Sequence, residues 1–147
     1  MKYAVPLYSP ATVNAAGRAL KEGRDQLDHG QDVLEVINNW RASHAYVLNA
    51  FHTTLKNRTK KIWTGSLTAQ RIKRRESILA KLQRQKSMNL SQMQDIGGCR
   101  AVMRTIGQVR ELAELYAGNT IVHERVGMKD YLEQPKADGY RGIHLIY

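Results

Sequence analysis

Apolar residues recur at helical spacing through residues 33–55, and this pattern constrains the fold more than any other feature of the chain. The apolar positions are Val33, Leu34, Ile37, Trp40, Val47, Leu48, Phe51 and Leu55. They predict either one long amphipathic helix or two consecutive helices that break near Ser43 and His44. Because one face of such a helix has to be covered, we expect Trp40, His44 and Phe51 to belong to a buried stripe.

A shorter helix is predicted before this segment, and strands alternate with helices after it. Ser9-Pro10 has the order of an N-cap and a first helical residue, and good helix formers continue to Leu20. Beyond Lys61 we expect extended chain at 62–64 and 66–68 leading into Arg71-Ile72-Lys73, helices at 76–85 and 109–116, and strands at 97–103, 121–125 and 142–147. This order predicts an α/β or α+β domain with an N-terminal helical layer.

The composition excludes several classes of protein. No segment approaches the ~18 consecutive apolar residues that a membrane helix needs, and the N-terminus lacks the apolar stretch of a secretory signal. We therefore expect a cytoplasmic protein without a membrane partner. The single cysteine, Cys99, excludes an internal disulfide and a cysteine-cluster zinc site, and we expect it to be a core residue.

The positive charge is concentrated in one segment. Residues 54–86 contain eleven cations against one anion, Glu76, and so account for the whole net charge of +10. A field focused in this way favours a polyanionic partner such as a nucleoside triphosphate or RNA. The alternative is a solvated helix face that only increases solubility.

The spacing of these cations favours a phosphate site. Arg71 and Lys73 are two apart, so on a strand they point to one side. On the following helix, Ser77, Lys81 and Arg84 share one face. Cations that converge from a strand and a helix are suited to holding a triphosphate.

Two further segments contain residues that suit nucleotide chemistry. Asp95 precedes Gly97-Gly98 and could hold Mg²⁺, which takes one or two carboxylates together with phosphate oxygens; the alternative is an aspartate that caps a turn. The segment 129–144 reads as a binding loop that runs into a strand. In it Tyr140 offers a flat face for a base, and Lys129, Lys136 and Arg141 offer positive charge.

The order and internal spacing of these blocks resemble the synthetase domain of the RelA/SpoT family of alarmone synthetases. The blocks are Arg71-x-Lys73, Ser77-Ile78-x-x-Lys81-x-x-Arg84, Asp95-Ile96-Gly97-x-x-Arg100, and Lys129-Asp130-Tyr131-x-x-x-Pro135-Lys136-x-Asp138-Gly139-Tyr140-Arg141-x-x-His144. The resemblance covers residues 58–147, so residues 1–57 are expected to be a helical lead-in. In that lead-in, Asn38-Asn39-Trp40-Arg41-x-x-His44 looks like small single-domain members, including toxic ones from toxin–antitoxin and phage-defence systems.

The resemblance implies a nucleotidyltransferase-like mixed sheet and a pyrophosphokinase of the stringent response. Such an enzyme transfers pyrophosphate from ATP to the 3′-hydroxyl of GDP or GTP with Mg²⁺. By the resemblance, the ATP-binding residues are Arg71, Lys73, Ser77, Lys81, Arg84 and Arg100; the acceptor-binding residues are Lys129, Tyr140, Arg141 and His144; Asp95 is the metal ligand; and Asp95 and His144 are catalytic.

One departure from the family pattern leaves the enzymatic activity open. The family carries a second acid, in a Glu-x-Gln pattern, on the strand after the histidine block, and this chain reaches only Tyr147. We therefore expect a C-terminally incomplete domain that is inactive alone. The alternatives are a toxin that pyrophosphorylates the tRNA 3′ end and pairs with an antitoxin protein, an enzyme with an adenine-nucleotide acceptor, and a catalytically dead nucleotide-binding module.

Overall fold

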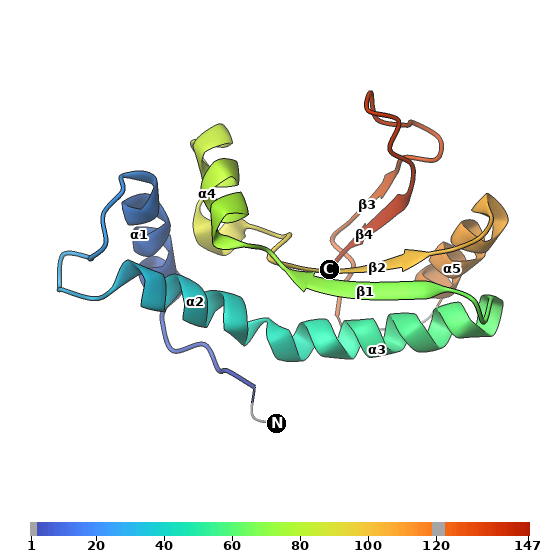
Figure 1. Cartoon of the computed structure of the whole chain (residues 1–147), viewed down its shortest axis with the longest axis horizontal. Helices are drawn as coiled ribbons and strands as arrows, with labels where there is room; N and C mark the ends of the chain where they lie inside the picture. Colours follow the sequence, from blue (N-terminus) through green and yellow to red (C-terminus); the bar gives the residue numbers. More distant parts are fainter. Residues whose placement is uncertain (1–2, 119–122) are drawn as a thin grey trace. The chain divides into compact units, whose positions relative to one another are not determined.

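The computed structural model describes residues 3–118 and 123–147 and contains both helices and short strands (Figure 1). The elements are α1 (Pro10–Lys21), α2 (Val33–Ser43), α3 (Ala45–Ile62), β1 (Leu67–Ile72), α4 (Arg75–Arg84), the 3₁₀ turn η1 (Leu90–Gln92), β2 (Gly97–Val102), α5 (Ile106–Gly118), β3 (Gly127–Asp130) and β4 (Ile143–Ile146). Three helices precede the first strand, which corresponds to the two-helix alternative for residues 33–55. The α/β class with an N-terminal helical layer is confirmed.

The chain divides into two compact units, each of which draws on two separate segments. The first unit comprises Met1–Phe51 and Gln70–Cys99, and the second comprises His52–Ala69 and Arg100–Tyr147. Both units therefore take in residues from either side of position 58. The expected division into a lead-in at 1–57 and a synthetase domain at 58–147 stays a prediction.

The core of the first unit lies among α1, α2, α4 and η1. Ser9 caps α1, because its Oγ accepts from the backbone N of Thr12 at 3.2 Å, and Pro10 occupies the first turn. Asp32 caps α2 through the backbone N–H groups of residues 34 and 35. The buried side chains are Val13, Ala16, Ala19, Val33, Val36, Ile37, Ile78, Leu82, Leu90, Met93 and Ile96. This core fixes α4 and the loop after it against the helical layer.

The predicted break between the two long helices lies at His44. This residue separates α2 from α3, and its Nδ1 is 2.7 Å from the carbonyl oxygen of Trp40. The rings of the two residues meet edge to face, with centroids 4.5 Å apart. Trp40 packs against the core, but Trp40, His44 and Phe51 are half-buried rather than fully covered.

The extended chain expected at 62–64 is wrong, because α3 continues to Ile62. Thr59 is fully buried and its hydroxyl donates to the carbonyl oxygen of Lys56, so a polar residue occupies the apolar face without an unpaired group. The chain then turns at Gly65. A Cβ there would lie 2.6 Å from Cζ2 of Trp63, so only glycine lets the indole fold back over the turn. β1 starts two residues later, at Leu67.

The strands described form two two-stranded sheets, β1 with β2 and β3 with β4. β3 and β4 are antiparallel, and Lys129 stands opposite His144 in their register. The strand expected at 121–125 lies partly outside the described residues, and its described part, 123–125, forms no strand. The pairing partner of the last strand is instead Gly127–Asp130.

No helix within residues 3–118 and 123–147 is long and apolar enough to cross a membrane.

Candidate functional site

Two lysines and one aspartate meet in the first unit. Lys73 Nζ lies 2.8 Å from Asp95 Oδ2, and Lys81 Nζ lies 2.5 Å from Asp95 Oδ1. The lysine side chains are only 12% and 19% exposed, whereas the aspartate is 46% exposed. Both carboxylate oxygens therefore accept from ammonium groups, and one edge of the cluster remains open to solvent.

The local fold explains why these three residues meet. Lys73 follows β1 directly, and its backbone N donates to the carbonyl oxygen of Ile96 at 2.7 Å, which places it beside Asp95. Lys81 lies on α4, which is oriented by the fully buried Ile78 and Leu82. The sequence-predicted residues Lys73, Lys81 and Asp95 are thus brought together by strand pairing and by helix packing.

The electrostatics of the cluster favour an ionised Asp95. Burial alone raises the pKa of its carboxyl, but hydrogen bonds from Lys73 and Lys81, together with their charges, lower it by more. The pKa of Asp95 therefore lies below its usual value. These contacts also favour an ion-pair role over the turn-capping alternative, because the aspartate accepts from side chains of two other elements.

A cavity of about 560 Å³ adjoins this cluster. It is lined by Lys73, Ser77, Ala80, Gln83 and Arg84, so three predicted ATP residues share one concave surface. Ser77, Ala80 and Arg84 recur three to four positions apart on α4 and so share one face of the helix. Two cations, Lys73 and Arg84, therefore line this cavity.

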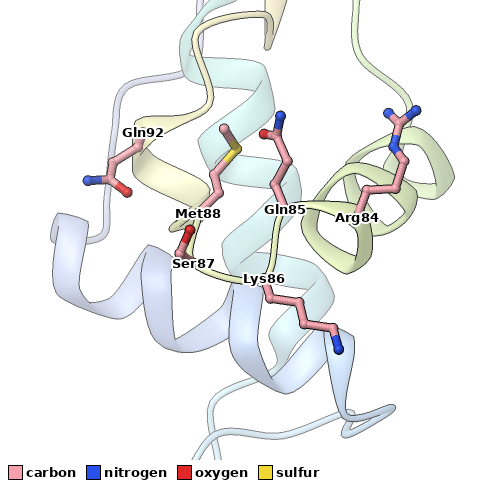
Figure 2. A pocket seen from close by; sticks show the side chains of 6 residues that line it. All are labelled: Arg84, Gln85, Lys86, Ser87, Met88 and Gln92. Carbon is pink, nitrogen blue, oxygen red and sulfur yellow. The ribbon is translucent and has the colours of Figure 1, made fainter.

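A second cavity, of about 760 Å³, lies at the C-terminal end of α4 (Figure 2). It is lined by Arg84, Gln85, Lys86, Ser87, Met88 and Gln92. In Figure 2 the Arg84 side chain points up and the Lys86 side chain points down, so the two charged groups do not converge on one point. Arg84 belongs to the linings of both cavities.

The two remaining predicted ATP residues lie on strands. Arg71 is exposed on β1, two residues before Lys73. Arg100 is exposed on β2 and belongs to the second unit, where its positive charge acts on His144. Arg100 therefore lies near the predicted acceptor residues of its own unit.

An aromatic cluster forms in the second unit around β3 and β4. Tyr140 Oη lies 2.9 Å from His144 Nε2. The ring of Tyr131 meets both of these rings edge to face, with centroids 5.9 and 5.1 Å apart. Lys136 Nζ lies 4.7 Å from the ring centre of Tyr131 and 5.1 Å from that of Tyr140. We call these four residues the ring cluster.

Positive charge surrounds the histidine of the ring cluster. Burial lowers the pKa of His144, and the charges of Lys136, Lys129 and Arg100 lower it further. The imidazole is therefore neutral at pH 7, and one of its ring nitrogens can accept a proton or a hydrogen bond. Arg141 is exposed beside the cluster.

Tyr131 is absent from the predicted site residues, although it contacts two of them. Its neighbour Asp130 fixes the start of the loop, because its carboxylate accepts from the backbone N of Leu132 at 2.8 Å and of Glu133 at 3.2 Å. The carboxylate also lies 3.5 Å from the guanidinium of Arg110 on α5. In the sequence, Asp130-Tyr131 stands a few residues before Pro135-Lys136, and this spacing is the signal from which Tyr131 could have been identified as a site residue.

Few of the described side chains near the cavity could act as metal ligands. No group of three or more His, Cys, Asp or Glu residues that could hold a metal ion occurs in the described part of the chain. Asp95 is a single half-exposed carboxylate beside a cavity with two cations. That chemistry fits Mg²⁺ carried in with phosphate oxygens, and it does not fit a site built from protein ligands alone.

The sequence profile of a family described as "Region found in RelA / SpoT proteins" matches residues 70–147, more than half of the chain. The chain belongs to the RelA/SpoT family, which confirms the resemblance of its four blocks. Among curated proteins, none matches it significantly.

Two solved structures share its fold. Small alarmone synthetase 1 from Bacillus subtilis, bound to its product pppGpp, aligns with a TM-score of 0.66 and 22% sequence identity, covering 74% of this chain and 59% of that one. Small alarmone synthetase 2 from Bacillus subtilis aligns with a TM-score of 0.59 and 27% sequence identity, and the alignment again covers 74% of this chain and 59% of that one. This chain therefore spans about three fifths of the length of each synthetase.

Proposed function

We propose that the chain carries the donor site and the acceptor loop of an ATP-dependent pyrophosphokinase whose acceptor is a guanine nucleotide. Membership of the RelA/SpoT family and the fold shared with two small alarmone synthetases support the reaction class. Small alarmone synthetase 1 was solved with its product pppGpp bound, and this guanine product supports a guanine acceptor here.

The observation that carries the proposal is the contact of Lys73 and Lys81 with the two oxygens of Asp95. Each ammonium group is paired with one oxygen of the same carboxylate. Lys73 lines the adjoining cavity, and Lys81 is tied to Lys73 through Asp95. Transfer of both ammonium groups from Asp95 to the oxygens of a triphosphate would free the carboxylate. Asp95 is the residue that would hold Mg²⁺, which supplies charge neutralisation on the phosphate oxygens when bound.

The remaining residues take positioning roles. Ser77 and Arg84 line the same cavity as Lys73 and would bind the outer phosphates. Arg71, in the same unit as Lys73, is an exposed cation that would extend the contacts to ATP, and the ATP-binding role of Arg100, in the second unit, stays a prediction. In the ring cluster, Tyr140 would stack on the acceptor base, and Lys129, Arg141 and the neutral His144 would surround its phosphates and sugar.

Calorimetric titration of Mg²⁺–ATP into the chain tests the donor half. We expect binding in the wild type and a loss of about tenfold or more in Lys81→Met, since a charge-assisted bond to phosphate is removed. Equal affinities of the wild type and Lys81→Met for Mg²⁺–ATP would mean that this lysine has a purely structural role. Thin-layer separation of products from labelled ATP with GDP or GTP then tests transfer by the chain. Binding without transfer would support the catalytically dead module.

A second acceptor, the 3′ end of tRNA, has its own supporting observation. Lys56 and Lys60 are exposed and lie four residues apart on α3, so they present two cations on one helix face. Such a face could contact an RNA backbone. tRNA binding that weakens steeply with salt, and weakens further in Lys56→Ala/Lys60→Ala, would favour this acceptor and a toxin role. The same variant should leave Mg²⁺–ATP affinity unchanged.

A further inference from the structure

Arg41 lies in the last turn of α2 and reaches the residue that follows β1. Its Nε donates to the backbone carbonyl oxygen of Lys73 at 2.8 Å, in a half-buried position. Its Nη1 donates to Oδ1 of Asn38, one turn earlier on the same helix, at 3.2 Å. The amide of Asn38 thus orients the guanidinium, and the guanidinium holds the backbone of a predicted donor residue.

The peptide groups of Lys73 are held from two directions. Its N–H donates to Ile96, beside Asp95, at 2.7 Å, and its carbonyl accepts from Arg41. The first backbone carbonyl that accepts a hydrogen bond within α4 is that of Arg74, and its donor is the backbone N of Ile78 at 3.0 Å. The carbonyl of Lys73 therefore lies just outside the helix and needs a donor from another element.

This fixed backbone matters for the lysine side chain. An ammonium at the end of a flexible four-carbon stem is positioned by its backbone more than by its own rotamers. Lys73 is 12% exposed and its ammonium reaches Asp95, so a small rotation of its peptide would displace the ammonium from both the carboxylate and the cavity.

We propose that Arg41 is a positioning residue of the donor site, which fixes the peptide of Lys73 so that its ammonium can reach the phosphates of the triphosphate. The inference rests on the proposed function, because it takes Lys73 as a donor ligand. The hydrogen bonds of Arg41 run to the Lys73 carbonyl and the Asn38 amide.

The charge of Arg41 has to be separated from its hydrogen bond. A backbone hydrogen bond of Glu76 lowers the pKa of that carboxyl most, and the charges of Arg75 and Arg41 lower it further, so the Arg41 charge acts at the start of α4. Arg41→Gln and Arg41→Met form a matched pair that removes the charge in both cases. The amide nitrogen of glutamine is as many bonds from Cα as the Nε of arginine and can donate the same bond, whereas methionine cannot.

We expect Arg41→Gln to bind Mg²⁺–ATP within about twofold of the wild type and Arg41→Met to bind about tenfold more weakly. Lys73→Met and the double variant Arg41→Met/Lys73→Met complete a thermodynamic cycle. If Arg41 acts through Lys73, the double variant binds no more weakly than Lys73→Met. Arg75→Ala is the control, since it removes an exposed cation that pairs with Glu76 in the same region, and it should keep wild-type affinity.

Wild-type affinity in Arg41→Met, or losses that add in the double variant, would overturn the inference and leave the proposed function standing. Absence of Mg²⁺–ATP binding by the wild type would overturn both. If Arg41→Met is unfolded at the assay temperature by circular dichroism, Asn38→Ala replaces it, because that change removes only the orienting acceptor. It should bind about threefold more weakly, with no added loss in the Lys73→Met background; unchanged affinity would contradict the inference.

Discussion

Lys73 Nζ and Asp95 Oδ2 lie 2.8 Å apart, and this contact joins the turn after β1 to the residue two positions before β2. The second oxygen of Asp95 pairs with Lys81 on α4, so one half-exposed carboxylate contacts two lysines that are largely covered, and its single negative charge balances only one of theirs. These three groups therefore stabilise the fold, and Lys73 also lines the candidate donor cavity.

Replacing Asp95 by Asn should destabilise the chain while removing the predicted metal ligand. The change leaves two nearly covered ammonium groups without a counter-charge, so we expect a loss of about 1–2 kcal/mol, between the values for exposed and buried pairs. Urea unfolding at pH 7 measures this loss. Asp28→Asn is the control, because Asp28 forms an exposed pair with Arg24, and it should change stability by less than about 0.5 kcal/mol. Equal effects of both changes would contradict the prediction.

The stability of the chain should depend on pH through His144. Its pKa is lowered in the folded state, so between that value and about 6.5 the unfolded chain binds a proton that the folded chain does not. The free energy of unfolding should therefore fall as the pH drops below about 6.5. His144→Gln should flatten this dependence in urea melts between pH 5 and 7, whereas His29→Gln, at an exposed histidine in the α1–α2 connection, should retain the wild-type slope. An unchanged slope in His144→Gln would refute the assignment.

Asp95 should add a separate dependence at lower pH. Because its folded-state pKa is depressed, its contribution to stability is present above about 4 and is lost as the pH falls through the lower value. Acid titration of the wild type and Asp95→Asn, followed by circular dichroism, compares the two. The variant should show the smaller loss of stability between pH 4 and 2, and parallel curves would mean that Asp95 has no depressed pKa.

Tyr140→Phe separates the two roles of the tyrosine in the ring cluster. An exposed stacking platform is the simplest expectation from the sequence, yet the hydroxyl bonds His144 and the ring contacts Tyr131. Loss of the hydroxyl should cost about 0.5–1.5 kcal/mol of stability and leave stacking on a guanine nucleotide intact. Melting curves and GDP titration measure the two effects. Tyr46→Phe, at a tyrosine that is 62% exposed, is the control and should change neither. Lost GDP binding in Tyr140→Phe would assign the hydroxyl to the ligand.

Local chemistry made much of the first unit predictable. The N-cap at Ser9 follows from residue types and lies where the sequence places it. Apolar spacing left one long helix or two consecutive helices open, and the structure has two, with the break at the position considered, His44. The end of α3 was not predictable in this way. Thr59 looks polar, but its hydroxyl is satisfied within the helix, so the helical face continues through it to Ile62. The start of β1 then depends on Gly65 and the fold-back of Trp63.

The candidate site was only partly predictable because its contacts join distant segments. The grouping of Lys73, Ser77 and Arg84 on one cavity follows from strand and helix periodicity. That Asp95 would bind two lysines at once depends on the pairing of residue 73 with residue 96, which no local pattern encodes. The spacing of Tyr131 from Pro135-Lys136 marks it in the sequence, but its contact with His144 depends on the antiparallel pairing of β3 with β4.

Gly17 offers a test of how closely α1 packs on η1. A Cβ at this position would lie 2.8 Å from Cβ of Leu90, which is 1% exposed. In an open helix, Gly→Ala stabilises by about 1 kcal/mol, but here the clash should reverse the sign and destabilise by about 1–3 kcal/mol. Gly107→Ala on α5 is the matched control: its nearest contact is Thr105 Oγ1 at 3.8 Å, so it should stabilise slightly. Thermal melts compare the two, and a Gly17→Ala variant that melts at or above the wild type would show that η1 can move away from α1 at little cost.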